Sequence, residues 1–357
     1  MNKRKKTDFL TVVLFFGIIL TFMIYIGLGF MFADLKGKER NAFSFNSAFY
    51  NDEGLNNIIK NYEYKAFGHV KNSNVIVGKE DFLFEICDEK YNYDYLLDFI
   101  GGLEYSDEEL KTIEAEILSR QETYEKQGIE YILVVIPNSI NICSEYLPDF
   151  IGDGGGQTRL SRLDSYLSER GIDCFFNITD DMKADIPLGQ LFNNTENSVS
   201  AIGAYSIYNS VLENLPGKYS FEGNTKRLTY EDMSYIVRYT NGKEIAREAG
   251  IEDVVLNRTV SLTDDMIRRY YTEKNTGSYE KVKALEKYAQ EVNSGYTVLL
   301  EFSDEWDKIQ LMPYFSGTFD SVVYKTGLEY SAQVVSDNSP GIAIQFIHEN
   351  ELDMLLG

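Results

Sequence analysis

The chain has 357 residues, of which 44% are hydrophobic and 14% aromatic, and it carries a formal net charge of −22. This length and composition are those of a folded chain with a large core, and they exclude the disordered and fibrous classes. An acidic surface repels phosphate backbones, so we expect no nucleic acid partner.

The N-terminus is typical of a membrane anchor. Residues 1–8 form a basic tip, and residues 9–32 contain no charged side chain. A helix of 24 residues spans about 36 Å, enough to cross a hydrocarbon core of about 30 Å. The rival interpretation, a cleaved signal peptide, usually has a shorter apolar region of about 7–15 residues and a better cleavage site. The positive-inside rule then predicts a single-pass cell-membrane protein with a cytoplasmic N-terminus and an extracytoplasmic C-terminal domain.

Residues 33–72 are polar and rich in Asn, and they predict a juxtamembrane spacer. The predicted folded domain covers residues 73–357. It opens at residues 75–85, where apolar and polar side chains alternate around a turn at Gly78, a pattern typical of a β-hairpin.

A helix is predicted next. Ser106 and Glu109 have the spacing of a capping box, which indicates a helix start. Apolar side chains then recur on one helical face, and Gly128 predicts the end of the helix.

Strand and helix patterns alternate along the rest of the chain. Leucines at helical spacing predict a helix closed by Gly171, and residues 199–214 predict another. Residues 218–295 are mixed and charged, and we expect an insertion or covering segment there. Short apolar runs predict buried strands at 131–137, 173–178, 296–302, 321–325 and 341–347. The alternation predicts an α/β fold with a doubly wound, flavodoxin-like parallel sheet flanked by helices, which binds ligands beyond the carboxyl ends of its strands.

Five segments occur in the order of the landmarks of one family. They are VIVGKEDFLFE, IPNSINICSEYLP, LFNNTENSVSAIGAY, EFSDEWDKIQLMPYF and PGIAIQFIHENEL. Together they resemble the SGNH-hydrolase-like proteins that O-acetylate alginate and other cell-surface polysaccharides, and the resemblance spans roughly residues 40–357. It implies an SGNH-like fold and acyl transfer by a serine triad. In such a triad a Ser attacks the acyl carbon, a His takes its proton and an Asp orients the His.

The chain departs from the family in the loop that should supply the acid and base. Anchored on Gly203 and Ala204, the family Asp falls on Glu196 and the family His falls on Ser198. No shift of this alignment places a histidine in the loop.

The nucleophile is also replaced. The family Gly-Asp-Ser-Phe turn corresponds to Ser303-Asp304-Glu305-Trp306, which puts Glu305 in the serine position, and an alignment shifted by one puts Trp306 there. The resemblance therefore implies a pseudoenzyme of polysaccharide O-acetylation that binds glycan or a partner, such as a multi-spanning membrane O-acyltransferase. We take Asn138, Asp304 and Trp306 as candidate substrate-binding residues.

Three alternatives stay open. Ser303 and His348 could form a rearranged catalytic site of an active O-acetyltransferase or esterase; the other histidine, His69, lies in the spacer. Glu196 and Glu305 could act as a carboxylate pair of the kind that cleaves glycosidic bonds, although chance neighbours in a degenerate site explain them as well. Finally, the chain could be a structural envelope protein.

We expect neither a cofactor nor a bound metal, because no ligand spacing supports one. Cys87, Cys143 and Cys174 are isolated along the chain, which allows one disulfide but no disulfide framework.

Overall fold

The computed structural model describes residues 74–357, except for residues 89, 153, 216–226, 286–295 and 304 and the side chains of 305–308. Before residue 74 it describes only Gly17, Leu20, Tyr64, Lys65 and Val70. No helix in this described part is long and apolar enough to cross a membrane. The predicted span 9–32 and the predicted spacer lie almost wholly outside the described residues, as does His69. Two compact units divide the chain, Met1–Tyr62 and Glu63–Gly357, and the second is described below.

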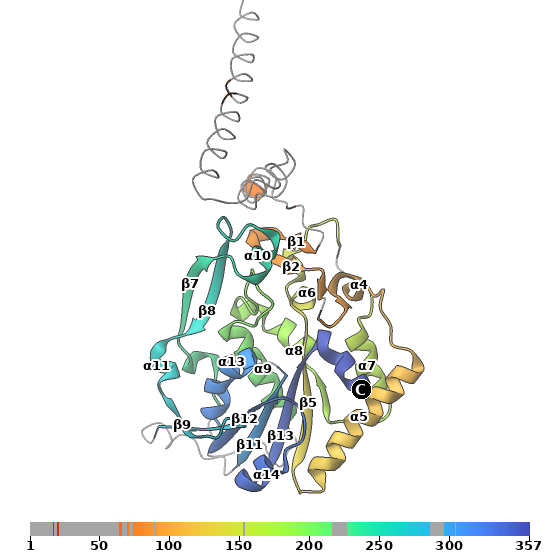
Figure 1. Cartoon of the computed structure of the whole chain (residues 1–357), viewed down its shortest axis with the longest axis vertical. Helices are drawn as coiled ribbons and strands as arrows, with labels where there is room; N and C mark the ends of the chain where they lie inside the picture. Colours follow the sequence, from red (N-terminus) through yellow and green to blue (C-terminus); the bar gives the residue numbers. More distant parts are fainter. Residues whose placement is uncertain are drawn as a thin grey trace, which may run out of the picture. The chain divides into compact units, whose positions relative to one another are not determined.

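A seven-stranded sheet forms the centre of this unit (Figure 1). Its order is β6 (Phe175–Asn177), β5 (Glu130–Ile136), β13 (Ile342–His348), β11 (Thr297–Phe302), β12 (Ser321–Thr326), β10 (Glu280–Ala284) and β9 (Tyr270–Asn275). The first five strands are parallel, which confirms the strands predicted from the apolar runs. However, β10 and β9 are antiparallel, so the sheet is mixed and not wholly parallel as expected.

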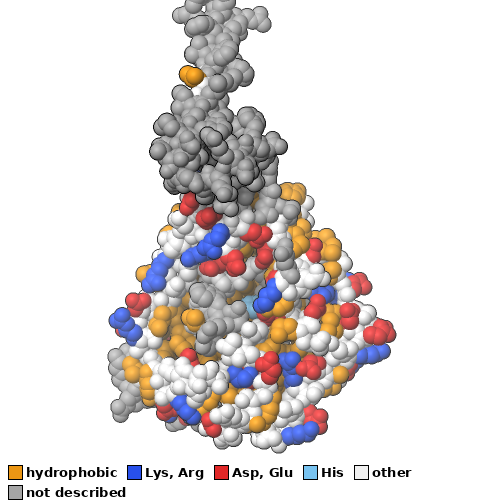
Figure 2. All heavy atoms as spheres, viewed as in Figure 1, with side chains coloured by type: hydrophobic (Ala, Val, Ile, Leu, Met, Phe, Trp, Pro, Cys, Tyr) orange, Lys and Arg blue, Asp and Glu red, His pale blue; other side chains and the backbone are white. Residues whose placement is uncertain are grey.

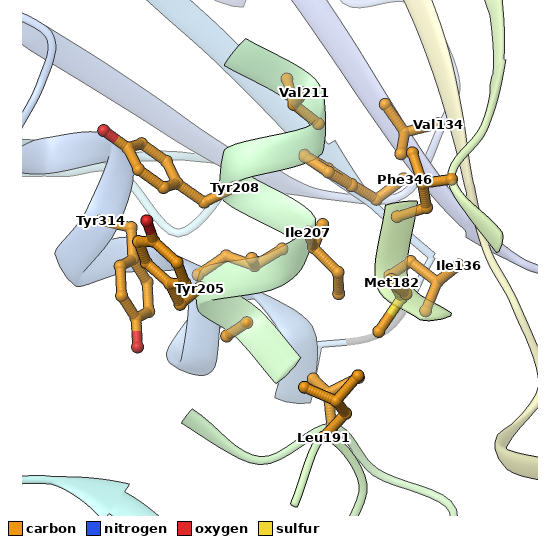
Figure 3. Packing of buried hydrophobic residues seen from close by; sticks show 14 of the residues in the cluster. Val134, Ile136, Met182, Leu191, Tyr205, Ile207, Tyr208, Val211, Tyr314 and Phe346 are labelled. Atoms are coloured by element: carbon orange, nitrogen blue, oxygen red, sulfur yellow. The ribbon is translucent and has the colours of Figure 1, made fainter. Parts of the chain in front are cut away.

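Helices cover both faces of the sheet. Successive residues of β5 point to opposite faces, and apolar side chains on each face pack against helices. On β5, Ile132, Val134 and Ile136 belong to one core cluster, which includes α8 (Thr179–Ala184), α9 (Ala201–Asn214) and α13 (Glu305–Ser316). The intervening residues of β5 belong to a second cluster with α5 (Asp107–Glu125), α7 (Arg159–Ser168), α14 (Ala332–Asn338) and η6 (Glu349–Leu356). Figure 3 shows part of the first cluster. Tyr205 and Tyr208 of α9 lie beside Tyr314 on one side of the helix, and the strand residues Val134 and Phe346 lie on the other side.

The two local motifs predicted before β5 are confirmed. The hairpin consists of β1 (Val75–Val77) and β2 (Leu83–Glu85), which pair in antiparallel fashion across η1 (Lys79–Asp81). Helix α5 begins with the capping box: the Ser106 backbone N–H donates to Glu109 at 2.7 Å, and the Ser106 hydroxyl accepts from the Glu109 backbone.

The segment 218–295 contributes to the sheet as well as to its surroundings. Strands β7 (Tyr235–Asn241) and β8 (Leu256–Leu262) form a separate hairpin that encloses α10 (Glu244–Ala249) in sequence. Strands β9 and β10 instead extend the central sheet at one edge, which a covering segment would not do. The remaining elements are short: β3 (Cys87–Asp88), β4 (Tyr93–Asp94), α4 (Tyr95–Phe99), α6 (Ser139–Ile142), η2 (Ser144–Tyr146), η3 (Ile186–Leu188), η5 (Tyr230–Asp232) and α11 (Asp264–Ile267).

A row of polar side chains crosses the middle of the sheet on the face covered by α5. Glu301 of β11 is the direct neighbour of Lys325 on β12 and of Gln345 on β13. The Glu301 carboxylate lies 3.3 Å from the Lys325 ammonium and accepts hydrogen bonds from Gln345 and Tyr124 at 2.7 and 2.6 Å. Glu301 and Gln345 are fully buried. The cost of burying these groups is therefore offset by mutual pairing.

Candidate functional site

A cavity of about 510 Å³ opens where the parallel strands end at their carboxyl termini. Its walls come from β2 and the segment after it, from residues 137–139 after β5, from the 192–198 loop, from α10, and from residues 348–351 after β13. Figure 2 shows a hollow near the middle of the face that it draws, with acidic side chains beside it. This is the place where a doubly wound sheet binds its ligands.

Four of the residues singled out from the sequence line this cavity: Asn138, Glu196, Ser198 and His348. Ser303 is not among the described residues that line the cavity. It lies next to Glu351, which does line the cavity. Asp304 lies outside the described residues, and so do the side chains of Glu305 and Trp306. The roles predicted for all of these residues stay predictions.

The 192–199 loop is a tight turn held by its own backbone. Phe192 and Val199 form an antiparallel bridge, and the Asn193 N–H donates to the Ser198 carbonyl at 2.9 Å. The helix that follows, α9, is capped by the Ser200 hydroxyl, which accepts from the backbone N–H of Gly203 at 3.1 Å. A Cβ on Gly203 would lie 2.1 Å from the Leu191 carbonyl oxygen, so this position needs glycine.

Neither Ser198 nor Glu196 is the histidine of the family triad. The Ser198 hydroxyl accepts a hydrogen bond from the Asn193 side-chain amide at 2.8 Å. A hydroxyl is not a base at neutral pH. Burial raises the pKa of the Glu196 carboxyl, while the nearby Lys243 ammonium and the Asn257 amide at 3.4 Å act in the opposite direction.

Glu85, at the end of β2, is a lining residue that the sequence did not single out. Burial, together with the charges of Asp88, Glu248 and Glu244, raises its pKa to about 7. Its carboxylate accepts a hydrogen bond from the Asn197 amide at 2.6 Å. Glu85 closes the hairpin landmark of the family resemblance, which is the one signal that could have drawn attention to it.

His348 and Ser303 meet at Glu351. The His348 backbone N–H donates to the Glu351 carboxylate at 3.2 Å, and the Tyr91 hydroxyl donates to its other oxygen at 2.6 Å. Burial raises the pKa of Glu351, but His348, Ser303 and Tyr91 outweigh that effect and hold the pKa below its ordinary value. The Ser303 hydroxyl makes no well-aligned hydrogen bond within the described part of the chain, and its oxygen is closed to solvent.

Behind the cavity, Glu349 holds Asn138 in place. Its carboxylate accepts from the Asn138 backbone N–H at 2.8 Å and from the Asn141 side chain at 2.7 Å. Glu349 is 1% exposed, and burial, followed by the charge of Asp98, raises its pKa to about 7. The sequence predicts that Glu349 follows the last strand, but its burial could not be predicted from the sequence.

In the described part of the chain, no group of three His, Cys, Asp or Glu side chains is placed to hold a metal ion. Cys87, Cys143 and Cys174 are not joined in a disulfide, so the one that the sequence allowed does not form among them.

Neither the known protein-family models nor the curated proteins contain a match to this chain. Solved structures do. Bacillus cereus PatB1 with a sulfonyl adduct aligns with a TM-score of 0.52 and 13% sequence identity, over 80% of this chain and 99% of PatB1. PatB1 without the adduct gives a TM-score of 0.51 over the same shares. The O-acetyltransferase domain of Pseudomonas putida AlgJ gives 0.48 and 11% identity, over 79% of this chain and 92% of that domain. The chain therefore shares its α/β fold with PatB1, and the resemblance inferred from the motifs is confirmed as a likeness of fold.

Proposed function

We propose that this protein is a membrane-anchored, extracytoplasmic SGNH-like protein of cell-surface polysaccharide O-acetylation, whose cavity binds glycan without serine catalysis. One observation carries the proposal. The loop that should supply the catalytic acid and base lies at the cavity, but it presents Glu196 and Ser198 there.

The magnitudes favour binding over catalysis. A positioned general base contributes about 10²–10⁴ in rate. Ser198 cannot act as one, and the Ser303 oxygen is closed to solvent. Without an accessible serine at the family's nucleophile position and without its histidine, what remains of the family mechanism is binding energy and the environment of the cavity, which is suited to holding a ligand.

The membrane localisation and the partner protein are part of the same proposal. The uncharged run 9–32 and the basic tip before it support a single-pass anchor with the described unit outside the cytoplasm. The family resemblance supports a multi-spanning membrane O-acyltransferase as the partner. Protease added to intact cells should degrade the described unit, and complete protection of it would contradict this topology.

Turnover of an acetyl ester tests the absence of catalysis. We expect the purified chain to hydrolyse p-nitrophenyl acetate no faster than buffer. We also expect no mass increase after incubation with phenylmethylsulfonyl fluoride, a reagent that marks activated serines. Acetyl transfer to a polysaccharide at the rate of an ordinary acetyltransferase would overturn the non-catalytic role.

A binding experiment tests the second part of the proposal, that the cavity binds glycan. A panel of purified bacterial surface polysaccharides, with and without O-acetyl groups, would be titrated against the chain. Asn197 lines the cavity with an exposed side chain, so Asn197→Trp should fill the cavity and abolish binding. Ser119→Trp, on the exposed side of α5, is the matched control and should bind normally. Equal binding by both variants would place the glycan elsewhere.

A second candidate function, an active esterase or O-acetyltransferase, is favoured by one observation. Ser303, Glu351 and His348 lie together at the cavity edge, and the Glu351 carboxylate is held ionised there. This candidate requires a movement that exposes Ser303. It predicts turnover that is lost in both Ser303→Ala and His348→Ala, and turnover unchanged in either variant would eliminate it.

A further inference from the structure

We propose that the cavity selects a glycan that carries cationic groups, namely the ammonium groups of amino sugars that lack their N-acetyl substituents. This inference rests on the proposed function, which supplies the glycan-binding site. It adds the chemistry of the glycan that the site prefers.

The cavity lining is strongly acidic. Six acidic side chains line it: Glu85, Asp88, Glu196, Glu244, Glu248 and Glu351. The only lysine or arginine among the described lining residues is Lys90. Its ammonium is engaged by Tyr91, both through the phenol oxygen and at 4.3 Å over the ring.

Five of the six accept hydrogen bonds from protein groups: Glu85 from Asn197, Glu196 from Asn257, Glu248 from Asn74, and Asp88 and Glu351 from their neighbours. Asp88 accepts hydrogen bonds from the Lys90 backbone at 2.9 Å and from the Asn350 amide at 2.9 Å. Glu351 is held by Tyr91 and by the His348 backbone, as described above. These two groups maintain the floor of the cavity.

The other four line a wall shared by β2, α10 and the 192–199 loop. Glu244 and Glu248 are four residues apart on α10, so they lie on the same face of that helix, where like charges repel. Glu85 interacts electrostatically with both, and Glu196 interacts with Glu244. Among the described residues no ion pair joins Glu85, Glu196 or Glu244 to a lysine or arginine.

The spacing of these carboxylates suits ammonium groups better than a metal ion. A metal site needs three or more ligands converging on one point, and no such group exists in the described part of the chain. Carboxylates distributed over a cavity can each accept a hydrogen bond from a separate ammonium group, since an ammonium is a compact donor of three hydrogens.

The remaining lining residues suit a sugar. Tyr95 and Phe192 contribute aromatic rings to the wall, and Asn197 and Ser139, which are hydrogen-bonded to each other at 3.2 Å, contribute polar groups. The volume of 510 Å³ lies within the range of about 300–1,000 Å³ typical of small-molecule sites. A polymer of uronic acids would bring negative charge to this wall and would be repelled.

The experiment compares three oligosaccharides of equal length by calorimetric titration of the full chain at pH 6.5. They are the glucosamine tetramer, the fully N-acetylated tetramer and a tetramer of mannuronate. We expect the glucosamine tetramer to bind at least tenfold more tightly than the acetylated one, no binding of the mannuronate tetramer, and weaker glucosamine binding at higher salt. Equal affinity for the acetylated tetramer, or tighter binding of mannuronate, would overturn the inference and leave the proposed function standing.

Variants separate the cavity from the general negative charge of the chain. Glu244→Gln should weaken glucosamine tetramer binding about tenfold, while Glu169→Gln at the end of α7 should leave it unchanged. Asn197→Trp should abolish it. If Glu169→Gln weakens binding as much as Glu244→Gln, or if Asn197→Trp binds normally, the attraction belongs to the whole surface and the inference fails. Loss of binding to every tested glycan and to the polysaccharide panel would contradict the proposed function as well.

Discussion

Replacing Glu349 by Gln should make the stability of this protein less dependent on pH. The Glu349 carboxyl is 1% exposed, and its pKa is raised from 4.5 to about 7. In the unfolded chain the same carboxyl titrates near its ordinary value. Between the two pKa values the folded protein therefore binds one proton that the unfolded chain does not. The contribution of this group is fully present below about pH 4.5 and is lost as the pH rises towards 7.

The magnitude follows from proton linkage. The free energy of unfolding should fall by about 1.4 kcal/mol for each pH unit between these pKa values, or about 3 kcal/mol in total. Glutamine resembles the protonated carboxyl and can accept hydrogen bonds from Asn138 and Asn141 through its oxygen. The variant should therefore match the wild type near pH 5 and exceed it in stability by about 1–3 kcal/mol at pH 8.

Urea unfolding followed by far-ultraviolet circular dichroism at pH 5, 6, 7 and 8 measures this difference. The substitution also removes the interaction of Glu349 with Asp98, so the difference between the two free energies reports the titration of this pair. Ser119→Ala, at an exposed position of α5 without a titrating group, serves as the control and should give a difference independent of pH. The reasoning would be refuted by wild-type and Glu349→Gln curves that run parallel, or by a wild type that gains on the variant as the pH rises.

Two further predictions concern local structure. Gly203→Ala should lower the free energy of unfolding by about 1–3 kcal/mol, because its Cβ would overlap the Leu191 carbonyl, whereas Gly155→Ala, with open space around it, should change thermal stability little. A melting temperature of Gly203→Ala equal to that of the wild type would contradict the close packing before α9. Ser106→Ala should cost about 1 kcal/mol in chemical unfolding by removing the cap of α5, and a loss as small as that of Ser119→Ala would show that the cap contributes nothing.

The central part of the fold could be predicted from the sequence because its signals are local. The run 131–137 is continuously apolar, and the strand it forms is buried on both faces of the sheet. The helix start at Ser106 depends on two side chains three residues apart. Strand β9 gave no such signal: after its first residue every side chain is exposed, so no alternation marks it. Its place at the sheet edge depends on pairing with β10, which a pattern of charged residues does not reveal.

For the candidate site, too, some residues could be predicted from the sequence and others could not. Glu196, Ser198, Asn138 and His348 could be gathered in advance, because a likeness of motifs placed each near the carboxyl end of a strand. The acidic wall could not, since Glu85 and α10 lie about 160 residues apart in the chain and meet through tertiary packing alone. Asp304 and the side chains of Glu305 and Trp306 lie outside the described residues, so their predicted roles have no structural test.

The polar row across β12, β11 and β13 has a consequence for how the chain folds. Glu301 meets Lys325 and Gln345 only in the observed strand register. A slip of one residue would turn the carboxylate to the opposite face of the sheet, among apolar side chains and without its ammonium. The row thus penalises misaligned sheets even if it adds little net stability to the correct one. We expect a chain with apolar residues at all three positions to keep its stability but to lose this penalty on misaligned strands.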